Sequence, residues 1–151
     1  MSAAVAPVAQ ANAPAHLHPV RVYWEDTDAG GVVFYANYLK YFERARTEWL
    51  RAAGFGQQAL VEETGAMFVV ADTRLHYLQP ARLDDLLQVS VEPQQFGRAR
   101  LVIQQRCLRG SELLCEGSIH IACVDRGSFK PRRIPTDLLQ RLAASASTLP
   151  A

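Results

Sequence analysis

The chain carries no strong excess of charge of either sign and no long hydrophobic run. Its 16 Lys and Arg stand against 15 Asp and Glu, which gives a net charge of +1. A charge so close to zero excludes a strongly basic nucleic-acid-binding protein. No stretch approaches the roughly 20 apolar residues of a membrane-spanning helix. No Lys or Arg precedes Arg21, so we expect no signal peptide, no integral membrane segment and a cytoplasmic location.

Cysteines are also scarce, and their spacing suits neither a disulfide framework nor a zinc site. There are three, Cys107, Cys115 and Cys123, with no C-x-x-C pair and no histidine at ligand spacing. The pattern predicts reduced thiols in a core and no bound metal. The motifs of nucleophile-elbow hydrolases, P-loop NTPases, dinucleotide enzymes and zinc proteases are likewise missing, which removes the commonest enzyme classes.

What is present is the composition of one ordinary globular domain. Of the 151 residues, 49% are apolar and 21% charged, which is typical of a folded chain of this length. Residues 1–18 are rich in Ala and Pro without periodicity, and we expect them to form a disordered tail. The folded domain is expected at residues 19–146, followed by a disordered C-terminus at residues 147–151.

Periodicity predicts a central helix surrounded by strands. Asn37 is expected to cap a helix over residues 38–53, whose apolar side chains share a wide face and which ends at Gly54. After Met67 the apolar residues alternate instead, which predicts strands joined by short hairpin connections. Other elements are expected at residues 20–24, 87–92, 98–104 and 113–123 (strands) and 57–63 and 137–144 (helices).

This order predicts an α+β fold in which one antiparallel five-stranded sheet wraps around the helix. Because such a sheet leaves its edges open, we expect a dimer joined through the sheets.

An acidic loop is the strongest candidate for chemistry. Glu25, Asp26 and Asp28 lie just before Gly30 and Gly31, a few residues ahead of the expected helix. The first N–H groups of a helix lack partners, so a carboxylate and an anion-binding site would be neighbours. A plain acidic turn explains the same residues equally well. A calcium loop does not, because the later ligand positions lack suitable oxygens.

Residues 23–39, which read YWEDTDAGGVVFYANYL, resemble the signature of the 4-hydroxybenzoyl-CoA thioesterase family. They look closest to its Tol-Pal-associated acyl-CoA thioesterase branch, as do residues 42–50, 77–85 and 130–135. The resemblance covers nearly everything after the tail. It implies the hotdog fold, in which an antiparallel sheet wraps a long helix, and a homodimer or homotetramer.

The resemblance also implies the roles of two residues. Asp28, the second aspartate of D-x-D-x-x-G, would be the nucleophile or general base, and the backbone N–H of Tyr35 would donate to the oxyanion. Many members of the Tol-Pal branch carry histidine at the position of Tyr35, whereas the 4-hydroxybenzoyl-CoA enzymes carry tyrosine. A thioester needs only a carboxylate and oxyanion hydrogen bonds, so no cofactor is expected beyond the coenzyme A of the substrate.

Basic residues supply candidates for binding that coenzyme A. Lys130, Arg132 and Arg133, held between two prolines, would clamp its phosphates, with Arg82 as a weaker candidate; a solvated basic loop is the competing interpretation. The aromatic residues Tyr38, Phe42 and Trp49 would line an acyl pocket or belong to the core.

The expected function is hydrolysis of an acyl-CoA to a free acid and coenzyme A. The alternative is a non-catalytic hotdog protein that binds an acyl carrier protein or an envelope complex. A hotdog dehydratase would need a histidine beside the aspartate, and the acidic loop has none. The acyl group and its carrier, coenzyme A or acyl carrier protein, are not readable from the sequence.

Overall fold

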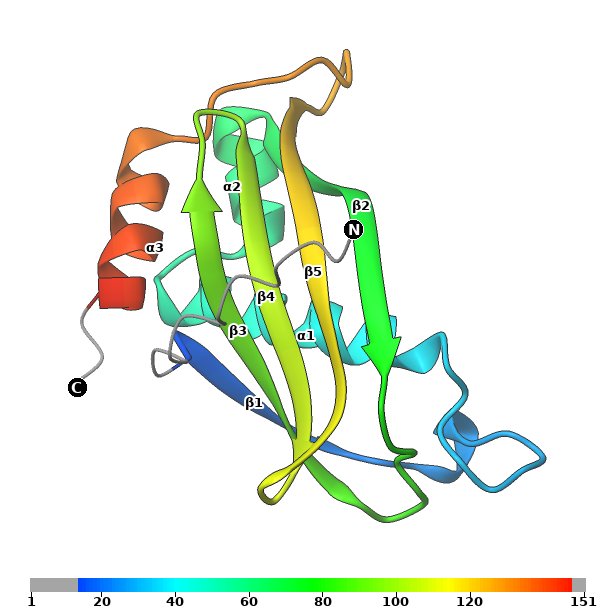
Figure 1. Ribbon diagram of the computed structural model, residues 1–151. Helices are drawn as coiled ribbons and strands as arrows, with labels where there is room; N and C mark the ends of the chain where they lie inside the picture. The colour runs from blue at the N-terminus through cyan, green and yellow to red at the C-terminus, as the bar shows by residue number, and fades with distance from the viewer. Residues whose placement is uncertain (1–13, 148–151) are drawn as a thin grey trace, which may run out of the picture.

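The computed structural model describes residues 14–147. Its centre is one five-stranded antiparallel sheet in the order β1-β3-β4-β5-β2, curved around a long helix (Figure 1). The expected α+β fold, with five strands around a central helix, is confirmed. The elements are β1 (His16–Arg21), the 3-10 turn η1 (Trp24–Asp26), α1 (Asn37–Ala52), α2 (Gln57–Thr64), β2 (Ala66–Tyr77), β3 (Leu86–Phe96), β4 (Arg100–Arg109), β5 (Glu112–Asp125) and α3 (Thr136–Ser147).

Helix α1 lies in the hollow of the sheet because one face of it is almost entirely apolar. Tyr41, Phe42 and Ala45 are completely buried, as the helical spacing predicts. The expected cap is wrong. Ala36 occupies the cap position, and Asn37 is the first helical residue. The Asn37 side chain instead donates from Nδ2 to the Asp26 carbonyl at 2.8 Å, which ties the helix start to the acidic loop.

The first strand begins earlier than expected. β1 starts at His16 and pairs with β3 from His16↔Val91 to Arg21↔Leu86, so residues 16–18 belong to the sheet and not to a tail. Backbone hydrogen bonds hold this edge strand, which therefore needs no apolar alternation. The chain leaves the sheet after Arg21, and Trp24 opens a turn. Residues 1–13 of the expected tail and residues 148–151 lie outside the described part.

Two further connections differ from expectation. β3 continues to Phe96 through an irregularity between Pro93 and Gln95, so the hairpin to β4 is shorter than the predicted connection at 94–97. The extra residue of such a bulge breaks the period of two that marks a strand in sequence. The β4–β5 hairpin turns at Gly110, which has φ +61, as expected. Helix α3 extends three residues beyond the predicted end at 144.

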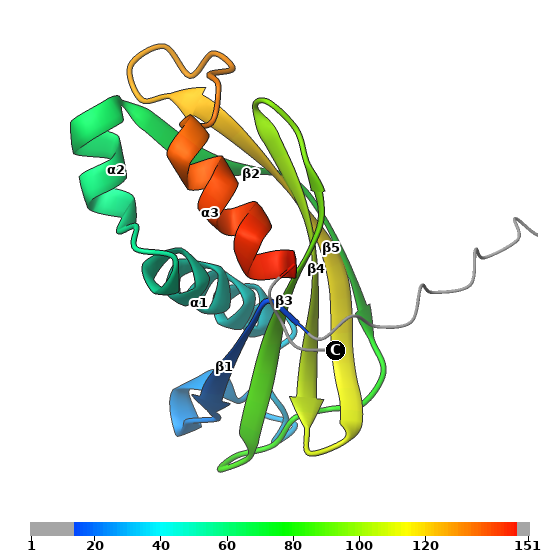
Figure 2. The same ribbon diagram turned by 90° about the vertical axis from the view of Figure 1, so that its left-hand side faces the viewer.

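All three helices lie on one side of the sheet (Figure 2). β1 and β2 form its two edges, and most of the second half of β2 is exposed. No helix in the described residues is long and apolar enough to cross a membrane.

Candidate active site

The acidic loop is held in shape by Asp26. Its carbonyl accepts hydrogen bonds from the Phe34 N–H at 2.9 Å and from Asn37 Nδ2 at 2.8 Å. Its carboxylate Oδ2 accepts the Tyr23 N–H at 2.8 Å. A single residue thus joins the beginning of the loop, its end and the first turn of α1. The sequence marked Asp26 only as one of three clustered carboxylates, and the structure shows that it holds the loop together.

Asp28 lies at the outer end of this loop. Its Oδ1 accepts the Gly30 N–H at 2.8 Å, and its backbone N–H donates to the Val32 carbonyl at 2.9 Å. Within residues 14–147 no Lys, Arg or His pairs with its carboxylate, which is exposed in the single chain. Oδ1 is therefore oriented, while Oδ2 is open to a substrate or a water molecule.

Unpaired backbone donors follow Asp28 seven and eight positions along the chain. The N–H groups of Tyr35 and Ala36 have no hydrogen-bond acceptor within the described part of the chain. They come directly before the first residue of α1, where the helix dipole adds partial positive charge. Two adjacent donors at this position suit an oxyanion, as the role expected for Tyr35 requires.

An open cleft of about 280 Å³ adjoins these donors. One side comes from the segment that follows the acidic loop and from α1, and the other from the end of β2 and the segment after it; Asp28 itself is not among the lining residues. The Val33 N–H donates to the Ala81 carbonyl at 2.8 Å, and the Ala81 N–H donates to the Tyr38 hydroxyl at 3.1 Å, which joins the two sides. The cleft is lined by Val33, Tyr35, Tyr38, Tyr77, Leu78, Gln79 and Pro80.

An ion pair that sequence reasoning missed secures the far side of the cleft. Arg109 donates from Nη1 to Asp85 Oδ2 at 2.7 Å and to the Pro80 carbonyl at 3.2 Å. The same carboxylate oxygen accepts the Arg82 N–H at 2.8 Å. Burial acts to raise the pKa of Asp85, but these hydrogen bonds outweigh it and hold the pKa below its ordinary value. Arg109 ends a strand with no motif around it, so the sequence offered no signal for this role.

The structure separates the basic residues into two groups. Arg82 is brought to the candidate site, because its backbone forms a bridge with Val32. Lys130, Arg132 and Arg133 lie on the loop after β5, at the opposite end of the molecule from the acidic loop in both ribbon views (Figures 1 and 2). Arg132 pairs with Asp125 at 2.9 Å, while Lys130 and Arg133 are exposed. Within one chain, this cluster and Asp28 do not form a common site.

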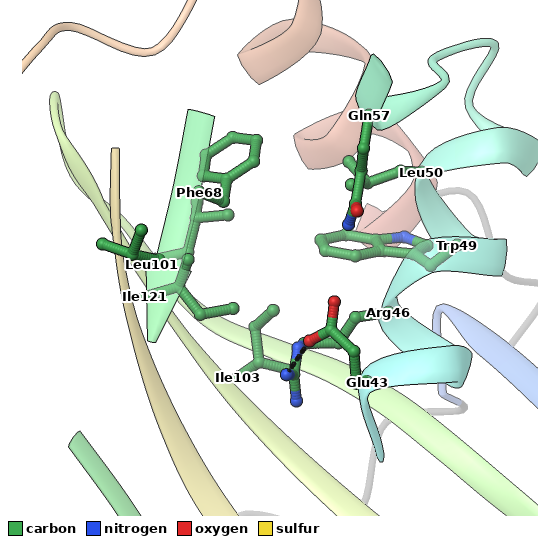
Figure 3. Close-up of a pocket in the computed structure, with 10 residues that line it drawn as sticks. Glu43, Arg46, Trp49, Leu50, Gln57, Phe68, Leu101, Ile103 and Ile121 are labelled. Carbon is green, nitrogen blue, oxygen red and sulfur yellow. Dashed lines mark hydrogen bonds and ion pairs between the residues drawn. The ribbon is translucent and has the colours of Figure 1, made fainter. Parts of the chain in front are cut away.

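A second, internal cavity of about 40 Å³ lies between α1 and the sheet (Figure 3). Its volume has room for water molecules but not for an acyl chain in this conformation. Arg46 borders it, bonded to Glu43 and, at 2.7 Å, to the buried amide of Gln105. Burial lowers the pKa of Arg46, with Glu43 acting in the opposite direction.

The three aromatic candidates on α1 are core residues. Tyr38, Phe42 and Trp49 are at most 3% exposed. Tyr38 also reaches the cleft, and Trp49 borders the internal cavity. Among the described residues, no three His, Cys, Asp or Glu come together as metal ligands. Burial raises the pKa of Cys107 and Cys115 to about 12, so these thiols are unreactive.

Comparison with known proteins supplies independent information. Residues 22–142 match the family model described as Thioesterase-like superfamily. The Acyl-CoA thioesterase YbgC of Haemophilus influenzae is 48% identical over 120 residues, which cover 80% of this chain and 88% of that protein. The Acyl-CoA thioester hydrolase YbgC of Escherichia coli O157:H7 is 47% identical over 122 residues, covering 80% and 90%.

Solved structures agree with the sequence relatives. A probable thioesterase from Bartonella henselae superposes with a TM-score of 0.75 at 36% identity, covering 80% of this chain and 98% of that one. A 1,4-dihydroxy-2-naphthoyl-CoA thioesterase from Synechocystis shares the fold, with a TM-score of 0.77 at 20% identity and coverage of 89% and 96%. The chain therefore belongs to the thioesterase-like superfamily of hotdog proteins, which confirms the expected family and the expected reaction class, thioester hydrolysis.

Proposed function

We propose that the chain hydrolyses acyl-CoA thioesters to a free carboxylic acid and coenzyme A, with Asp28 as nucleophile or general base. The observation that carries this proposal is an exposed, oriented carboxylate in the loop that leads to unpaired N–H donors at the start of α1. The relatives whose printed names include acyl-CoA support the substrate class.

Two routes lead from this geometry to the products. In the first, Asp28 Oδ2 attacks the thioester carbonyl, the N–H donors stabilise the oxyanion, and the coenzyme A thiolate leaves; water then hydrolyses the anhydride. In the second, the carboxylate takes a proton from water as the water oxygen attacks, and the tetrahedral intermediate expels the thiolate. Either route consumes one water and returns Asp28 to its carboxylate form once the thiolate is protonated.

The coenzyme A phosphates need cations, and of the four basic candidates one chain brings only Arg82 toward the cleft; Arg109 is already paired with Asp85 and Glu112. β2 suggests how a second copy supplies the others. It begins at Ala66, whose partner Asp125 binds Arg132, and it ends at Tyr77, which lines the cleft. Its outer edge pairs with no other strand among residues 14–147. Antiparallel pairing of two β2 edges about a twofold axis would bring the start of one strand beside the end of the other.

We therefore place each active site between two subunits of a homodimer. Asp28, the donors of Tyr35 and Ala36, and Arg82 come from one chain, and Lys130, Arg132 and Arg133 come from the partner. A homotetramer built from two such dimers keeps the same sites. The unreactive, unpaired thiols suit a reducing cytoplasm, which is where we place the reaction.

Thiol release from a panel of acyl-CoAs tests the proposal. Wild type is expected to hydrolyse at least one of them. Asp28→Asn keeps the shape of the side chain but loses its basicity, so kcat should fall about 10²–10⁴-fold. Glu25→Gln is the matched control, because it neutralises an exposed carboxylate three positions away and should leave kcat within about twofold.

The competing function is non-catalytic binding of an acyl carrier protein or an envelope complex. Tyr23 and Trp24, 61% and 80% exposed beside the acidic loop, are the feature that favours it, because exposed aromatics are common at protein interfaces. If wild type and Asp28→Asn show equal and negligible rates across the panel, the thioesterase proposal fails and non-catalytic binding is the function that remains. If hydrolysis occurs only with acyl carrier protein thioesters, the proposed mechanism stands, and the carrier is acyl carrier protein and not coenzyme A.

A further inference from the structure

Tyr77 makes a contact that the mechanism above does not use. Its hydroxyl donates a hydrogen bond to the Tyr35 carbonyl at 2.9 Å, across 42 positions of sequence. The residue ends β2, and its side chain is 43% exposed. Its ring packs edge-on against the rings of Tyr35 and Tyr38, with centroids 6.3 and 5.5 Å away. The hydroxyl is thus directed at the backbone that leads into α1.

That contact fixes one of two successive peptide groups. The Phe34 carbonyl accepts the Asn37 N–H at 2.8 Å, and the Tyr35 carbonyl accepts the Tyr77 hydroxyl. The opposite ends of the same two peptides are the N–H groups of Tyr35 and Ala36, which are unpaired in the described chain. In a planar trans peptide the carbonyl and the N–H point in opposite directions, so holding a carbonyl sets the direction of the donor behind it.

We propose that Tyr77 is a positioning residue for a two-donor oxyanion site, in which the Ala36 N–H is the second donor beside the Tyr35 N–H. The inference rests on the proposed thioesterase function. The Tyr77 hydroxyl holds the Tyr35–Ala36 peptide in place before substrate binds. It also polarises that amide, which makes the Ala36 N–H a stronger donor. Preorganised donors stabilise the transition state without reorganisation at the moment of reaction.

Tyr77→Phe removes the hydroxyl and keeps the ring. Loss of a whole oxyanion donor lowers kcat about 10²–10³-fold, and a donor that is only less well held should lose less, so we expect kcat to fall about tenfold. KM should stay within about twofold, since the hydroxyl acts on charge that develops in the transition state. Tyr23→Phe removes an exposed hydroxyl outside the cleft and is the matched control.

Fluorinated tyrosines at position 77 separate positioning from mere packing. They keep the ring and strengthen the hydroxyl as a donor, so kcat measured below the pKa of the substituted phenol should rise above that of wild type. The amide resonance of Ala36 should move with donor strength in the free enzyme, which is a readout independent of turnover. A merely structural tyrosine would show neither trend.

Each outcome bears on the inference. An unchanged kcat in Tyr77→Phe, or a loss confined to KM, overturns it while the proposed function stands. If kcat falls in Tyr77→Phe, but fluorotyrosine at position 77 neither raises kcat above wild type nor shifts the Ala36 amide resonance, the inference is also overturned. If wild type and Asp28→Asn are equally inactive on the whole panel, the proposed function fails and this inference fails with it. A kcat loss in Tyr77→Phe that follows donor strength supports it.

Discussion

The residues that shape the site do so through backbone atoms more than through side-chain contacts with one another. The Asp26 carbonyl accepts the Phe34 N–H, and the Arg109 side chain donates to the Pro80 carbonyl. Both contacts hold segments that border the cleft. Asp85 accepts from the Arg82 N–H and pairs with Arg109, so one carboxylate fixes the turn that follows the cleft-lining segment. Its ionisation should therefore be linked to folding stability.

We predict that Asp85→Asn lowers the melting temperature at neutral pH. The pKa of Asp85 in the folded protein lies below its ordinary value of 3.8, so the carboxylate stabilises the fold above that pH. This stabilisation is lost as pH falls through the folded-state pKa. The difference in melting temperature between wild type and Asp85→Asn should therefore shrink as the pH is lowered below 3.8.

Thermal melts of both proteins from neutral to acidic pH check this prediction. Asp84→Asn is the control, because Asp84 is the exposed neighbour, and Asn tolerates its φ of +68. An equal deficit for Asp85→Asn at every pH would show that ionisation of the carboxylate is not the source of its stabilising effect.

At the scale of elements, long periodic segments were predictable and pairings were not. The sixteen residues of α1 give several turns of one repeating pattern, so the helix and its buried face followed from the sequence. β1 was placed late because its pairing with β3 depends on backbone atoms. The bulge in β3 breaks the alternation, so the sequence predicted too short a strand, and the buried Arg46–Gln105 pair left no mark in the pattern.

The candidate site shows the same division. Asp28 and Tyr35 lie in one continuous motif, so the resemblance to the family was enough to predict both as site residues. Tyr77 and Arg109 act on residues 42 and 24 positions away, and nothing local to either marks the contact. The basic cluster was recognisable as a cluster, but its distance from Asp28 depends on the course of the whole sheet.

We predict that Gly117→Ala is strongly destabilising, because β2 passes too closely over this position of β5. An added Cβ would lie 2.4 Å from the Arg74 carbonyl oxygen and 2.3 Å from Leu75 Cδ2. The backbone cannot give way without loss of pairing, so the free energy of unfolding should fall by about 1–3 kcal/mol. Urea unfolding measures the change.

Gly56→Ala is the comparison for that experiment. An added Cβ there meets nothing within 4 Å, and its φ of −89 suits any residue. Because Gly56 is the N-cap of α2, the loss of a favoured cap residue and the reduced freedom of the unfolded chain oppose each other, and stability should change by less than about 1 kcal/mol. Similar losses of stability in both variants would mean that replacing glycine as such, and not the close approach of β2 to Gly117, determines the effect.

At the scale of the whole molecule, the acidic loop and the basic loop lie far apart, and the proposed homodimer is an assembly that would bring them together. In the proposed dimer, each chain would contribute one half to each of two sites, because the acidic loop and the basic loop lie toward opposite ends of β2 (Figure 1). A twofold dimer brings the halves together twice, once at each end of the shared edge. Catalysis would then depend on association, and specific activity should fall on dilution below the dimer dissociation constant.

If the sites are shared in this way, two inactive variants should complement each other in a mixed dimer. A chain with Asp28→Asn keeps its basic loop, and a chain with Lys130→Ala and Arg133→Ala keeps its carboxylate. When equal amounts are unfolded together and refolded, half of the dimers are hybrids, and each hybrid has one intact site and one doubly defective site. The mixture should recover about a quarter of the wild-type rate, whereas sites contained within single chains would recover nothing.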